Sequence, residues 1–126
     1  MELAQAATAF LKARYAVIGG LKEVTQENNE VVFHLDSTTH QVIIQESLKP
    51  VNASDKTTIA TLNTKENVEF LANNWDDFLH PQLSILFMNP QTQEQWKVIP
   101  YSHNKIAEKK HLKKGLLSLS SQVTLV

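Results

Sequence analysis

Asp36, Glu46 and Lys49 are the residues whose types and spacing could do chemistry in this sequence. Asp36 ends the alternating stretch "EVVFHLD", and Glu46 lies near the end of the next apolar stretch, "HQVIIQESL". Two carboxylates on neighbouring strands offer the oxygen ligands that a divalent cation prefers, and a metal held in this way can activate water or polarise a phosphate. Asp36 and Glu46 could therefore hold a divalent metal ion, with Lys49 just beyond the second carboxylate.

The same residues have a second interpretation that involves no chemistry. Asp is common at the start of turns, where its side chain bonds to the backbone, and Glu46 would then simply face solvent. Alternation along the strand also places Leu48 on the face of Glu46 and Lys49 on the opposite face. A metal site and an ordinary hairpin with polar ends therefore both remain open at this point.

The elements that would position these residues follow from the spacing of apolar side chains. Apolar residues three and four apart predict helices, and alternation predicts strands. We expect the following helices and strands in chain order: a helix at 2–14, strands at 15–26, 30–36, 40–48 and 58–62, a helix at 63–79, strands at 83–89 and 94–100, and a helix at 103–115.

Glycines and capping residues set some of these boundaries. Gly19 and Gly20 are expected to bend or bulge the first strand, and Gly115 is expected to end the last helix. Asn63 and Glu66 have the spacing of a helix capping box. Residues 116–126 fit either a final strand or a continued helix.

This order, α-β-β-β-(β)-α-β-β-α, predicts an α+β (mixed α/β) fold. The chain of 126 residues fits a single domain, spanning 1–126. We expect a central mixed sheet with two amphipathic helices packed on it.

Over about residues 2–88, the element order and the Asp36/Glu46 pair resemble the restriction-endonuclease-like nucleases of the PD-(D/E)xK type. The resemblance implies a protein, active or inactive, that acts on or binds nucleic acid through a metal-dependent phosphodiester site. It would make Asp36 and Glu46 the Mg²⁺ ligands and Lys49 a displaced catalytic lysine. The chain departs from the family pattern at the lysine, because the expected position holds Leu48 and only the displaced Lys49 is near.

A basic segment near the end of the chain could contact phosphate groups. Residues 105–126 carry five of the twelve basic residues and only one of the thirteen acidic ones. On a helix these lysines would form two adjacent rows at i, i+4 spacing, suited to nucleic-acid backbone or, alternatively, to a solvated helix face. The residues of this basic segment are Lys105, Lys109, Lys110, Lys113 and Lys114.

Composition excludes several other classes of site. The chain has no cysteine, so disulfides, thiolate catalysis and cysteine-bound metals are excluded. Its five histidines lack metal-ligand spacing and are interpreted as structural. No apolar run approaches the length of a membrane span, and the first residues lack the pattern of a secretory signal, so we expect a cytoplasmic protein that does not enter membranes.

A second function class fits the same element order. Small secretion-chaperone-like domains also run helix, three strands, helix, and usually form homodimers. The alternative prediction is therefore a non-enzymatic module, chaperone-like or an adaptor, that binds a protein partner and needs no metal.

Overall fold

In the computed structural model, which describes residues 2–53, 55–106 and 108–126, six strands form one sheet in the order β1-β2-β3-β4-β5-β6. The strands are β1 (Leu21–Glu27), β2 (Glu30–Leu35), β3 (Thr39–Gln45), β4 (Thr57–Leu62), β5 (Leu83–Asn89) and β6 (Glu94–Val98). The α-helices are α1 (Leu3–Ile18), α2 (Lys65–Asn73), α3 (Pro100–His103) and α4 (Leu112–Ser120), and two short 3₁₀ helices are η1 (Trp75–Phe78) and η2 (Lys109–His111).

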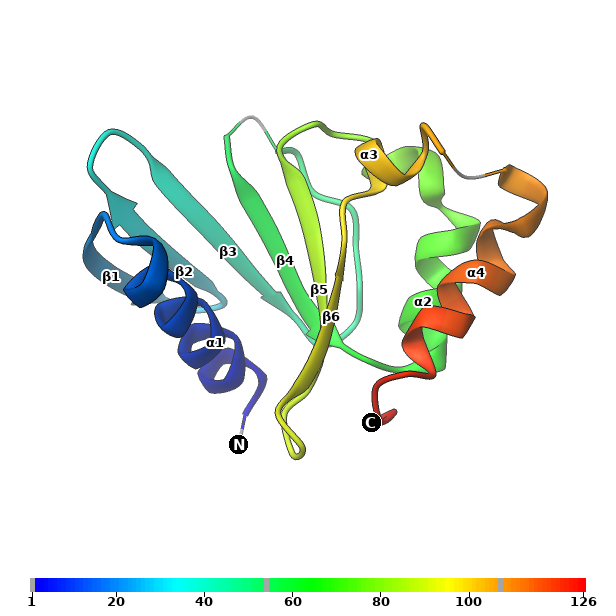
Figure 1. Ribbon diagram of the computed structural model, residues 1–126, viewed down its shortest axis with the longest axis horizontal. Helices are drawn as coiled ribbons and strands as arrows, with labels where there is room; N and C mark the ends of the chain where they lie inside the picture. Colours follow the sequence, from blue (N-terminus) through cyan, green and yellow to red (C-terminus); the bar gives the residue numbers. More distant parts are fainter. Residues whose placement is uncertain (1, 54, 107) are drawn as a thin grey trace.

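The sheet is mixed, as the sequence predicted. Strands β1, β2 and β3 form an antiparallel meander, β3, β4 and β5 run parallel, and β6 is antiparallel to β5. Helix α1 covers one face of the sheet, whereas α2 and α4 lie on the other (Figure 1). The single-domain α+β fold is therefore confirmed, with helices on both faces of the sheet.

The α1 face is packed by one apolar stripe of the helix. The helix side of this core contains Leu3, Ala6, Ala7, Leu11 and Tyr15, and the sheet side contains Val31, Phe33, Val42, Ala60, Leu86 and Met88. Their spacing of three and four residues along α1 is what a helix needs to bury a single stripe.

Helix α1 is longer than the sequence predicted, and this difference matters for the site. Residues 15–18 were expected to begin a strand, but they continue the helix, and Gly19 is its cap. Gly19 has φ of 90°, a conformation that glycine adopts without steric cost, and its N–H donates to the carbonyl of Tyr15 at 2.7 Å. The extra turn packs Tyr15 into the core against the sheet and leaves Ile18 largely exposed.

Helix α2 begins and ends at residues other than those predicted. Its N-cap is Thr64, whose hydroxyl accepts from the Asn67 N–H at 3.1 Å, so the expected cap at Asn63 is wrong. The helix ends at Asn73, and the predicted continuation to residue 79 is replaced by η1. Trp75 and Phe78 of η1 still join the core of this face.

The basic segment does not form the helix predicted at 103–115. Helix α3 ends at His103, and the chain becomes helical again only at η2 and α4. Gly115 lies inside α4 and does not end it, and α4 continues to Ser120, where a strand was the alternative. Ala107, which falls within the predicted helix, lies outside the described residues. None of the described helices is long and apolar enough to cross a membrane.

Candidate functional site

Asp36 and Glu46 lie at opposite ends of β3. In the β2–β3 register His34 is opposite Thr39, so Asp36 lies in the turn between these strands, whereas Glu46 follows the far end of β3 at Gln45. The length of β3 separates the two positions, roughly 20 Å at about 3.3 Å per residue. The structure therefore does not bring the two carboxylates together within one chain, and the shared metal site stays a prediction that this geometry does not support.

Each of the three predicted catalytic residues has a local role. Asp36 is exposed and lies 3.7 Å from the Lys22 ammonium. Glu46 is exposed too, while its backbone carbonyl accepts from the side-chain amide of Asn67 at 2.8 Å. The Lys49 N–H donates to the Gln45 side chain at 2.8 Å.

Position 48, where the predicted resemblance would require a lysine, holds a core residue. Leu48 is buried in the core beneath α2, so an apolar side chain is needed at this position. Across the described residues, no group of three or more His, Asp or Glu side chains is placed to hold a metal ion.

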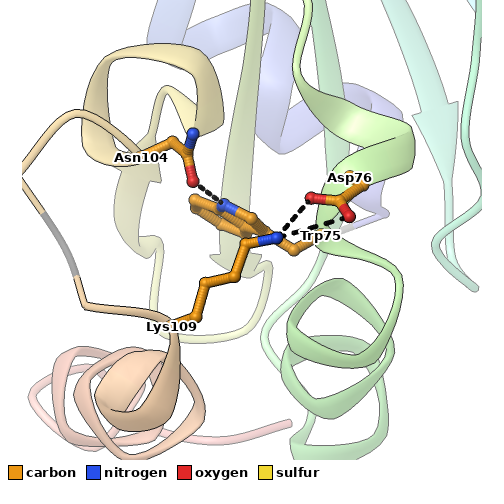
Figure 2. Close-up of polar contacts among 4 residues, drawn as sticks. All are labelled: Trp75, Asp76, Asn104 and Lys109. Atoms are coloured by element: carbon orange, nitrogen blue, oxygen red, sulfur yellow. Dashed lines mark hydrogen bonds and ion pairs between the residues drawn. The ribbon is translucent and has the colours of Figure 1, made fainter.

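Three of the five lysines in the basic segment pair with carboxylates. Lys113 lies 3.0 Å from Glu69 on α2, and Lys110 lies 3.6 Å from Glu108. Lys109 lies 3.2 Å from Asp76 on η1, next to the Trp75 indole that donates to Asn104 (Figure 2). The segment therefore ties α4 and η2 to α2 and η1, and it does not present the two continuous lysine rows that were expected.

A cavity of about 220 Å³ lies on the opposite face of the sheet, between α1 and the strands. We name it the cationic pocket, because its described lining contains Arg14, Lys56 and Lys97 and no acidic residue. The lining residues are Phe10, Leu11, Arg14, Tyr15, Ile18, His40, Lys56, Thr58, Ser84, Leu86, Gln95 and Lys97.

The three cations of this pocket come from separate elements. Arg14 is on α1, Lys56 immediately precedes β4, and Lys97 is on β6. The Arg14 guanidinium lies 5.8 Å from the Phe10 ring centre, and the Lys56 ammonium lies 5.8 Å from that of Tyr15. Within the described part of the chain, none of the three forms an ion pair.

The positive charge of the pocket is strong enough to affect its own members. Burial lowers the pKa of Lys97, and the nearby charges of Arg14 and Lys56 lower it further. Like charges disfavour one another's ionised form, so a bound anion would oppose the part of this lowering that comes from Arg14 and Lys56.

A chain of hydrogen bonds forms the floor of the pocket. The Tyr15 hydroxyl is 2.7 Å from His40 Nδ1, and His40 Nε2 is 2.7 Å from the Thr58 hydroxyl. Thr58 in turn is 2.8 Å from the Ser84 hydroxyl. A neutral imidazole has one donor and one acceptor nitrogen, so this chain can be completed in either direction.

His40 is neutral at physiological pH because of its surroundings. Burial, followed by the charges of Lys56 and Lys97, lowers its pKa from 6.5 to about 4. When the Tyr15 hydroxyl donates to His40 Nδ1, His40 Nε2–H donates to the Thr58 hydroxyl, and Thr58 donates to Ser84. The Ser84 O–H is then free to donate to a ligand in the pocket.

The sequence carried only one signal of this site. Trp96 and Val98 pack on the α2 face, so alternation sends Gln95 and Lys97 to the α1 face, where they line the pocket. Arg14 and Lys56 had no distinguishing pattern.

Comparisons of the chain with protein-family models, with curated proteins and with solved structures found no significant match.

Proposed function

We propose that this protein binds an anionic ligand, through a phosphate or carboxylate group, in the cationic pocket. The observation that carries the proposal is the convergence of Arg14, Lys56 and Lys97 on one cavity whose described lining includes no acidic residue. Placing like charges together raises the free energy of the folded protein, so an anion that neutralises them would be bound favourably.

The pocket offers groups that suit such a ligand. The planar guanidinium of Arg14 matches a phosphate or carboxylate in a bidentate manner, whereas Lys56 and Lys97 act as point charges. The Ser84 hydroxyl adds a donor from the sheet when the hydrogen-bond chain runs from Tyr15 toward Ser84. A cavity of about 220 Å³ accommodates one such group together with a small part of the molecule that carries it.

Calorimetric titration with inorganic phosphate tests the proposal. We expect binding by the wild type and at least a tenfold loss of affinity in Arg14→Gln and in Lys97→Gln, since each variant removes one charge from the pocket. The matched controls are Lys109→Gln and Lys113→Gln, which remove the same charge from the basic segment and should leave affinity unchanged. Equal losses in all four variants would mean that phosphate responds only to net charge and would contradict a specific site.

A second readout reports directly on the pocket. A bound anion should raise the pKa of Lys97 toward its ordinary value, because an opposite charge favours the ammonium form. Side-chain NMR of Lys97, titrated with and without phosphate, measures this change. An unaltered Lys97 titration in the presence of bound phosphate would place the ligand elsewhere.

Nucleic acid is one phosphate-bearing ligand that the proposal includes. Competition between a single-stranded oligonucleotide and inorganic phosphate for the pocket would extend the proposal to a polymer. Metal-dependent cleavage remains a separate prediction, and incubation of supercoiled plasmid with Mg²⁺ or Mn²⁺ tests it. Cleavage that is lost in Glu46→Ala would support it despite the separation of Asp36 and Glu46.

The adaptor alternative makes a different prediction. A homodimeric, protein-binding module would associate through apolar surface, and its self-association would not depend on Arg14 or Lys97. Sedimentation of the wild type and of Lys97→Gln, at several concentrations, distinguishes this alternative from anion binding.

A further inference from the structure

The cationic pocket continues into an exposed apolar surface on the C-terminal half of α1. A shallow depression next to the pocket is lined by Phe10, Ala13, Arg14, Val17 and Ile18. Phe10, Arg14 and Ile18 line both the depression and the pocket, so the two spaces are adjacent.

The apolar side chains of this surface are unusually open to solvent. Val17 is 88% exposed and Ile18 is 69% exposed, although both are large aliphatic residues. Exposed aliphatic residues that adjoin a binding pocket are typical of surfaces that contact a partner or a ligand. Arg14 is the one charged residue that lines this surface, and it also lines the adjacent pocket.

We propose that the ligand is an amphiphile, whose anionic group occupies the cationic pocket and whose alkyl chain lies along Phe10, Ala13 and Val17. This inference rests on the proposed anion binding at the same pocket. From Phe10 to Val17 the helix rises roughly 10 Å at about 1.5 Å per residue, which is the length of surface available to the chain. The shared lining residues favour one continuous ligand over a second, independent partner at α1.

Affinity as a function of alkyl chain length tests the inference. Inorganic phosphate, butyl phosphate and octyl phosphate are titrated calorimetrically below their micelle concentrations. We expect affinity to rise by about twofold or more for each added methylene, because each one leaves water for the apolar surface.

A matched pair of variants localises this gain to α1. The double variant Ala13→Ser with Val17→Ser changes two exposed residues that do not line the pocket. It should keep the affinity for inorganic phosphate and lose most of the dependence on chain length. The control Ile106→Ser alters another aliphatic residue, 85% exposed and outside this surface. It should keep both the affinity for inorganic phosphate and the dependence on chain length.

The source of the amphiphile is distinguished by a vesicle experiment. Co-sedimentation with phosphatidylcholine vesicles that contain phosphatidic acid, but not with pure phosphatidylcholine vesicles, would assign the ligand to a membrane lipid. Binding of octyl phosphate without co-sedimentation would assign it to a soluble amphiphile. Both outcomes support the inference.

Three outcomes would overturn it. Equal affinity for inorganic, butyl and octyl phosphate would mean that the alkyl chain does not contact the protein, and it would leave the proposal of anion binding intact. Absence of binding to any of the three would remove both proposals. Self-association that the double variant abolishes, with no chain-length effect, would assign the apolar surface of α1 to a second copy of this chain.

Discussion

Two groups of basic residues in this protein have opposite surroundings, because one group lies beside carboxylates and the other lines a pocket with no acidic residue among the described ones. Lys109, Lys110 and Lys113, close together in the sequence, lie 3.0 to 3.6 Å from carboxylates on the side of α2 and α4. Arg14, Lys56 and Lys97, far apart in the sequence, gather in one pocket on the α1 side of the sheet. The conspicuous cluster serves to join elements, and the dispersed residues form the candidate site.

The polar groups of the two faces differ in the same way. On the α2 and α4 side, buried amides are fully used: Asn63 donates to three carbonyls of the C-terminal segment and accepts from the Trp96 indole. On the α1 side, three cations lack a counter-charge within the described residues. Satisfied polar groups stabilise a fold, whereas unpaired charge that persists in a pocket indicates a place for a ligand.

The largest expected effect is on the satisfied face. Asn67→Ala should lower the free energy of unfolding by about 4 kcal/mol, because it leaves the Leu48 N–H and the carbonyls of Glu46 and Leu62 without their partner. Urea denaturation measures the change. Asn73→Ala, at an exposed position of α2, is the control and should change stability by less than about 0.5 kcal/mol. Similar small values for both variants would contradict a structural role for Asn67.

The next largest effect is the pH dependence of the α1 face. Because the pKa of folded His40 is about 4 and its ordinary value is 6.5, the unfolded chain binds the proton more readily. The stabilisation from neutral His40 is therefore complete above pH 6.5 and is lost as the pH falls toward about 4. The pKa difference corresponds to about 3 kcal/mol.

Urea denaturation across this pH range checks the assignment to His40. His40→Gln cannot titrate, so its stability should fall less steeply with decreasing pH than that of the wild type. Parallel curves for the two proteins would mean that other groups cause the acid sensitivity.

A smaller effect separates binding from stability at the cationic pocket. Lys97→Gln should raise the free energy of unfolding by less than about 1 kcal/mol at low salt, because it relieves repulsion that salt otherwise screens. Thermal unfolding at low and high ionic strength measures this. Added sodium chloride should stabilise the wild type more than the variant, and the reverse order would contradict unbalanced charge in the pocket.

The smallest effect is expected at the paired lysines. Lys109→Gln should lower the free energy of unfolding by less than about 0.5 kcal/mol, since both Lys109 and Asp76 are largely exposed. Thermal unfolding should show this loss at low salt and none at high salt. Stabilisation by this substitution, as expected for Lys97→Gln, would remove the contrast between the two groups.

The sequence by itself determined the α+β class and the positions of most strands. Strands β2, β3, β4 and β5 lie within one or two residues of their predicted starts because each is marked by alternating or continuous apolar residues. Helix ends were less predictable. Gly19 fits a bulge as well as a helix cap, and only the packing of Tyr15 against Phe33, with ring centres 5.5 Å apart, selects the longer helix.

The tertiary structure alone decided the site. Local spacing paired Asp36 with Glu46, but the antiparallel register of β2 and β3 sends them to opposite ends of a strand. Local spacing also could not predict that Arg14, Lys56 and Lys97 lie together. They come from distant parts of the chain, and the order of the strands and the placement of α1 bring them to one pocket. Spacing along the chain specifies which face of an element a side chain occupies, whereas contacts between distant elements depend on how those faces pack.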